Sequence, residues 1–152
     1  KRLEAKQKQM KQENRLLRQA EELNHLREKA NSLREELIRR MEVFQKVPSL
    51  HDTTGEDETS INLSQEDWKE ITTLLNNQYD QFTHRLKKAV PALITADIQF
   101  CCLLKINVSM QDIANIYHIN KESVSRRKQR IKSKIGNDLL QGLTLDEFIQ
   151  RF

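Results

Sequence analysis

The chain has 152 residues, a formal net charge of +4, and a composition that is 37% hydrophobic and 32% charged. Its three glycines and two prolines are far fewer than the roughly 12% of average usage, so hairpins are rare and helices are expected almost throughout. The longest apolar run, residues 100–104, is too short to cross a bilayer. Cys101 and Cys102 lie inside that run, which predicts buried thiols in a reducing compartment and not a disulfide framework.

Residues 1–47 contain no glycine and no proline, and apolar residues recur there at seven-residue spacing. This pattern is typical of a coiled coil, so we predict one helix over 1–47 that pairs with a second copy as a parallel homodimer. The expected dimer contacts are Leu16, Leu23, Leu26, Leu33 and Leu37. The alternative is a single charged helix that folds back on the rest of the chain. The basic start at Lys1, without methionine, indicates a piece of a longer protein with a membrane or sensor segment upstream.

Residues 48–60 begin with a proline that ends this helix, and they are polar, acidic and glycine-containing, which predicts a flexible linker. A helical domain is then expected over 61–152. Ser64 is placed to cap its first helix, and one or two helices should follow as far as Val90. The residues expected to face inward in the second half of this stretch are Phe82, Leu86 and Ala89.

Residues 93–136 carry the start and stop signals of three short helices. We expect Thr95 to cap the first, Ser109 the second and Asn120 the third. Asp112 stands three residues after Ser109, where it would complete a capping box with that residue. Two short helices joined by a tight turn, the second of them basic, predict a helix-turn-helix.

The third of these helices, residues 121–135, carries seven basic side chains and one acidic side chain. At 100° per residue, Val124, Ile131 and Ile135 define a buried stripe, and polar side chains occupy the opposite side. The polar side chains expected to be exposed are Glu122, Ser125, Arg126, Gln129, Arg130 and Ser133. Arginine and glutamine can read base edges while flanking cations meet phosphates, as a recognition helix in the major groove requires.

The same stretch resembles the LuxR-type helix-turn-helix module, which is also the effector domain of NarL-type response regulators. The matching residues are Ile94-Thr95, Cys101 to Leu104, Asn107-Val108-Ser109, Ile113-Ala114, Ile119-Asn120, Ser123-Val124 and Lys134-Ile135-Gly136. This resemblance implies a bacterial transcription regulator that binds double-stranded DNA, with base contacts from Ser125, Arg126 and Gln129. Asn107 replaces the glycine of the family pattern, and Ser125 stands where lysine is frequent. The predicted phosphate contacts are Lys121, Arg130, Lys132 and Lys134.

The segment that precedes this module is similar to the corresponding region of bacterial membrane-anchored regulators built from tetratricopeptide repeats, a membrane span, a coiled coil and a helix-turn-helix. That similarity implies a cytoplasmic location for residues 1–152. At the other end, Thr144 is placed to cap a short helix over 144–152 with an apolar stripe. This stripe either docks on its own domain or makes a second dimer contact.

The sequence contains no motif that indicates catalysis or the binding of a metal or cofactor. There is no glycine-rich phosphate loop and no hydrolase or metalloprotease motif, and the four histidines are scattered. We therefore expect no enzyme, no cofactor and no metal site. The alternative to DNA binding is a coiled-coil scaffold that binds another protein. The linker carboxylates Asp52, Glu56, Asp57 and Glu58 either compete with DNA phosphates for the basic helix or only keep the linker solvated.

Overall fold

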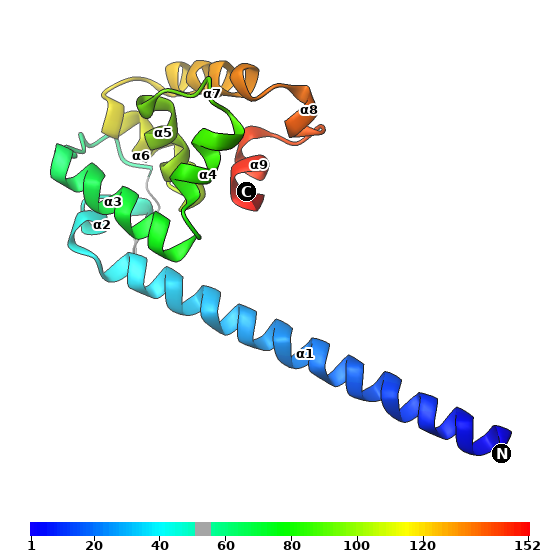
Figure 1. Cartoon of the computed structure of the whole chain (residues 1–152). Helices are drawn as coiled ribbons and strands as arrows, with labels where there is room; N and C mark the ends of the chain where they lie inside the picture. The colour runs from blue at the N-terminus through cyan, green and yellow to red at the C-terminus, as the bar shows by residue number, and fades with distance from the viewer. Residues whose placement is uncertain (51–55) are drawn as a thin grey trace. The chain divides into compact units, whose positions relative to one another are not determined.

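The structure is a computed structural model that describes residues 1–50 and 56–152, apart from the side chains of Arg39 and Arg40. All regular secondary structure in these residues is helical, as predicted (Figure 1). The elements are α1 (Arg2–Arg40), α2 (Glu42–Gln45), the 3-10 helix η1 (Pro48–Leu50), α3 (Gln65–Gln78), α4 (Phe82–Ala89), α5 (Thr95–Lys105), α6 (Met110–Tyr117), α7 (Lys121–Ile135), α8 (Asn137–Leu140) and α9 (Leu145–Arg151). The chain divides into two compact units, which we call the N-terminal unit (Lys1–Ile38) and the C-terminal unit (Arg39–Phe152).

The N-terminal unit consists of the long helix α1, whose existence the sequence predicts. The leucines at heptad spacing, which form the predicted dimer seam, are between 50% and 65% exposed, so an apolar stripe faces solvent along this helix. The leucines in question are Leu16, Leu23, Leu26, Leu33 and Leu37. No helix among the described residues combines the length and the apolar character needed to cross a bilayer.

The long helix ends at Arg40, before the predicted end at residue 47. Met41 is extended, with φ −68° and ψ 137°, and the short helix α2 follows it. Val43, Phe44 and Val47, which fall within the predicted coiled-coil helix over 1–47, are buried in the C-terminal unit. Burial of three apolar side chains in a domain core outweighs about two further turns of exposed helix, so the long helix stops at this point.

The core of the C-terminal unit is built around α5, which α3, α4 and α9 contact. Every residue from Phe100 to Leu104 is buried, because the helix has neighbours on several sides. Both cysteines of this run are buried and free, and burial raises the pKa of the Cys102 thiol to about 12. The thiols are therefore neutral core groups at physiological pH, as their position in the sequence suggests. The apolar stripe of α9 is also buried within this unit.

Most of the predicted helix caps are present. The side chains of Ser64, Ser109, Asn120 and Thr144 each accept a hydrogen bond from the backbone amide three residues ahead. The prediction for Thr95 is wrong, because Ile94 is the cap residue of α5 and its amide donates to Asp97 at 3.0 Å. The inward orientation of Ala89 is also wrong, since this residue is exposed, whereas Phe82 and Leu86 are buried.

Ser49 joins the chain after α2 to the start of α6. Its amide donates to Asp112 Oδ2 at 2.7 Å, and its hydroxyl oxygen accepts from the Ser109 amide at 3.0 Å. The predicted capping box is therefore replaced, because the buried Asp112 carboxylate binds Ser49 and not the Ser109 amide. The predicted flexible linker 48–60 thus begins with an ordered turn, and its residues 51–55 lie outside the described part of the chain.

The Ser49 contacts give a testable expectation for stability. Ser49→Ala removes the acceptor of the Ser109 amide, so the free energy of unfolding in urea should fall by about 1 to 2 kcal/mol. Thr73→Ala, at an exposed position of α3, is the control and should change it by less than about 0.5 kcal/mol. Equal effects of the two substitutions would show that Ser49 does not hold α6.

Candidate nucleic-acid interface

Helices α6 and α7 contact each other and are joined by a turn fixed at both ends. His118 ends α6 in the left-handed conformation with φ 55°, which histidine tolerates better than most residues. Asn120 then caps α7 by accepting a hydrogen bond from the Ser123 amide at 2.8 Å. Because one end of the turn is set by a local backbone conformation and the other by a local side-chain cap, the residues of the turn themselves determine where α7 starts.

Helix α7 buries one narrow stripe and exposes the side opposite to it. Val124, Ile131 and Ile135 are buried, as the helical angles predict. The exposed residues of α7 are Lys121, Glu122, Ser125, Arg126, Gln129, Arg130, Ser133 and Lys134. Figure 1 shows α7 at the edge of the C-terminal unit, where a helix can present a long polar side to a partner.

The three residues predicted to face bases lie together on this exposed side. Ser125, Arg126 and Gln129 line a shallow hollow with Arg130. The only ion pair described for this group joins Arg126 Nη2 to Glu122 Oε2 at 3.9 Å, and both side chains are well exposed. A pair at that distance in water contributes little, so the Arg126 guanidinium is available to a ligand.

Other cations of α7 contact residues of neighbouring helices. Arg127 lies over the ring of Tyr117, with 4.3 Å between the guanidinium carbon and the ring centre. Lys128 pairs with Asp146 at 3.1 Å, and Lys134, a predicted phosphate contact, pairs with Asp97 at 2.6 Å. These contacts attach α7 to α6, α9 and α5. The other predicted phosphate contacts, Lys121, Arg130 and Lys132, have no ion pair within the described residues.

Tyr117 is the residue that sequence reasoning missed at this surface. Its ring stacks on Phe100 at 5.9 Å between centroids and meets Trp68 at 6.3 Å, while Arg127 covers it from α7. Burial raises the pKa of the Tyr117 hydroxyl above its usual range, so the ring is neutral. The Tyr117 side chain thus contacts both the core helix α5 and α7. No local pattern pairs positions 117 and 127, so only the packing identifies this contact.

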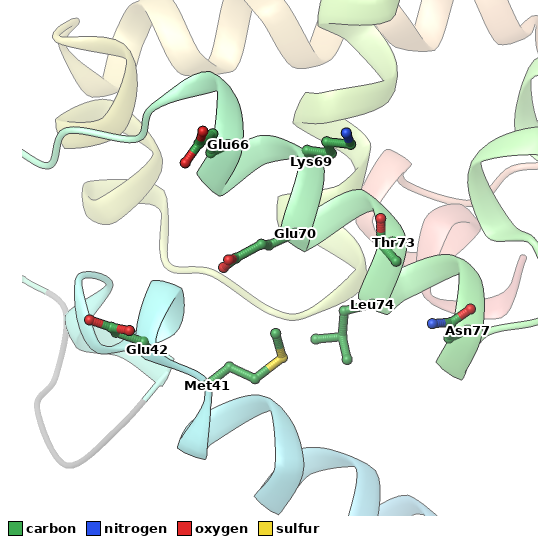
Figure 2. Close-up of a pocket in the computed structure, with 8 residues that line it drawn as sticks. All are labelled: Met41, Glu42, Glu66, Lys69, Glu70, Thr73, Leu74 and Asn77. Carbon is green, nitrogen blue, oxygen red and sulfur yellow. The ribbon is translucent and has the colours of Figure 1, made fainter.

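A second hollow lies between α2 and α3 (Figure 2). Figure 2 shows Met41 and Leu74 directed toward each other and Glu70 beside them. Three glutamates and one lysine line this hollow, at Glu42, Glu66, Lys69 and Glu70. Its surplus of carboxylates would repel phosphates, so it does not compete with α7 as a nucleic-acid surface.

Comparison of the chain with protein-family models, with curated proteins and with solved structures finds no match. The resemblance to LuxR-type modules therefore stays a prediction that depends on the residues quoted for it. The geometry of α6 and α7 is the basis for any functional proposal.

Arg127 and Arg130 test the division between internal and available cations, because both are arginines of the same helix. Arg127→Gln should lower the free energy of unfolding by about 1 kcal/mol, since it removes the cation–π contact with Tyr117. Arg130→Gln should leave it within about 0.5 kcal/mol, because that side chain is exposed. Urea unfolding of both variants decides the matter, and a larger loss at Arg130 would contradict the assignment.

Proposed function

We propose that the chain is the DNA-binding part of a dimeric transcription regulator and reads double-stranded DNA with α7. The observation that carries this proposal is the surface of Ser125, Arg126, Gln129 and Arg130, which is exposed on a helix whose other side is anchored. In a helix-turn-helix, the second helix enters the major groove while the first crosses the sugar-phosphate backbone. Helices α6 and α7, with their capped turn, have the order and lengths that this docking needs.

The side chains divide into two roles under this proposal. Arg126 and Gln129 have donors and acceptors that fit guanine and adenine edges, and Ser125 can contact either kind of base. Arg130, Lys132 and Lys121 would meet phosphates on both sides of the groove. Lys134 would contribute less than the sequence suggests, because a phosphate must compete with Asp97 for its ammonium group.

The N-terminal unit supports the dimeric part of the proposal. A stripe of half-exposed leucines at heptad spacing is apolar surface that a second copy of α1 would cover. Two DNA-binding units held by one coiled coil would read two half-sites, which raises affinity and selectivity together. The same stripe is also the observation that favours the other candidate, a scaffold that binds proteins without reading DNA.

The base-reading role predicts selective losses. We expect Arg126→Ala and Gln129→Ala each to weaken binding to a sequence selected from a random duplex library by about 1 to 3 kcal/mol, with much smaller losses on random DNA. Arg151→Ala, on the exposed end of α9, is the matched control and should affect neither DNA.

Fluorescence anisotropy on both duplexes at one salt concentration provides the measurement. Equal losses on selected and random DNA would remove the base-reading role. Failure of the wild-type chain to enrich any sequence, or to bind duplex DNA at low salt, would favour the scaffold.

If the chain dimerises through the leucines of α1, charged substitutions at those leucines should prevent dimerisation. Leu26→Glu combined with Leu33→Glu would place like charges against their copies, so sedimentation should show monomers. Asn24→Glu combined with Asn31→Glu adds the same charge outside the heptad seam, at exposed positions, and should leave the dimer intact. A wild-type chain that is already monomeric at high micromolar concentration would contradict the coiled coil.

A further inference from the structure

The acidic segment that precedes α3 is attached to α6. We call residues 56–61 the acidic strap. The Asp57 carbonyl accepts from Asn115 Nδ2 at 2.7 Å, and the Ile61 amide donates to the Asn115 carbonyl at 3.3 Å. Between them, the Ser60 hydroxyl is hydrogen-bonded to His118 Nδ1 at 3.0 Å. The strap is therefore docked along α6 as far as the turn that leads into α7.

Two further contacts make this docking specific. Ile61 is buried, so the strap ends in the core of the C-terminal unit. The side-chain oxygen of Asn115 accepts from Gln111 Nε2 at 3.0 Å, which orients the Asn115 amide toward the Asp57 carbonyl. A linker that was acidic only to stay solvated would need none of these contacts.

The docking places carboxylates beside the amino-terminal end of α7. Glu58 lines a hollow together with Asn120, Lys121 and Glu122. Glu56, Asp57 and Glu58 are all exposed on the docked strap, and Glu58 is the one of them that lines this hollow. Lys121 is the one cation among the described residues that line the hollow.

We propose that the acidic strap is an autoinhibitory contact that competes with DNA phosphates for the amino-terminal end of α7. This inference rests on the proposed function. A recognition helix enters the groove with its amino-terminal residues near the bases, so the flanking phosphates approach within the Debye length of the strap, about 10 Å at 0.1 M salt. Glu58 at this end of α7, with Glu56 and Asp57 on the same docked strap, repels the incoming strand and slows association until the strap leaves α6 or is screened by salt.

Two triple variants of the full chain test the inference with equal changes in net charge. The first, E56Q/D57N/E58Q, neutralises the strap and keeps the Asp57 carbonyl that docks it. The second, E42Q/E66Q/E70Q, neutralises the three glutamates of the hollow between α2 and α3. The probe is a random-sequence DNA duplex of about three helical turns, and stopped-flow fluorescence gives its association rate constant.

We expect the strap variant to associate at least about threefold faster than the wild-type chain at ~20 mM salt, with the difference vanishing at several tenths molar salt. The control triple variant should change the association rate constant by less than about 1.5-fold. Equal acceleration by both triples, or none by the strap triple, would overturn the inference while the proposed function stands. If neither the wild-type chain nor the strap triple binds the duplex, the proposed function fails and the inference fails with it.

A pair of uncharged substitutions separates docking from charge. Asn115→Ala removes the side chain that holds the Asp57 carbonyl, so the strap should leave α6 more often and association should again be faster. Asn77→Ala, at an exposed position of α3, is the control and should leave the rate unchanged. A rate that rises in neither variant would show that docking of the strap does not limit DNA access.

Discussion

The orientation of α7, on which the candidate interface depends, is set by the burial of a narrow apolar stripe in a strongly basic helix. Val124, Ile131 and Ile135 are the buried residues of α7. Each contributes about 1.5 to 3 kcal/mol of transfer free energy, whereas the surface ion pairs at Lys128 and Lys134 contribute at most about 1 kcal/mol each. The stripe therefore decides which side of α7 faces solvent, and the ion pairs only refine its position. The polar face with Arg126 and Gln129 follows directly from this constraint.

The anchoring of α7 also explains why its cations are not equivalent. Arg127 is directed toward Tyr117, while Arg126 and Arg130 point away from the core. A count of basic residues from the sequence treats all of them as available to phosphates. In the structure, fewer of the basic side chains of α7 are available to phosphates. The salt dependence of the proposed DNA binding should therefore reflect the number of available cations and not the total number.

Local signals predicted the helices well. Ser64, Ser109, Asn120 and Thr144 cap helices as expected, and α7 spans Lys121–Ile135 as predicted, because a cap or a helical period depends on residues within a few positions. Two misses were local, at the Thr95 cap and at the orientation of Ala89, and the others involve residues far apart in the chain. Asp112 binds Ser49, and the supposed linker docks on Asn115 and His118, across about sixty positions in each case. No pattern within one segment contains that information.

Under the proposed function, α7 contacts DNA through the side opposite its buried stripe. Titration of isotope-labelled chain with a random-sequence duplex, followed by amide chemical shifts, tests it most directly because it needs no substitution and no known operator. We expect the largest changes at Ser125, Arg126 and Gln129, with the hollow between α2 and α3 unaffected. The largest changes at Glu66 and Glu70, or no changes in α7 at low salt, would contradict it.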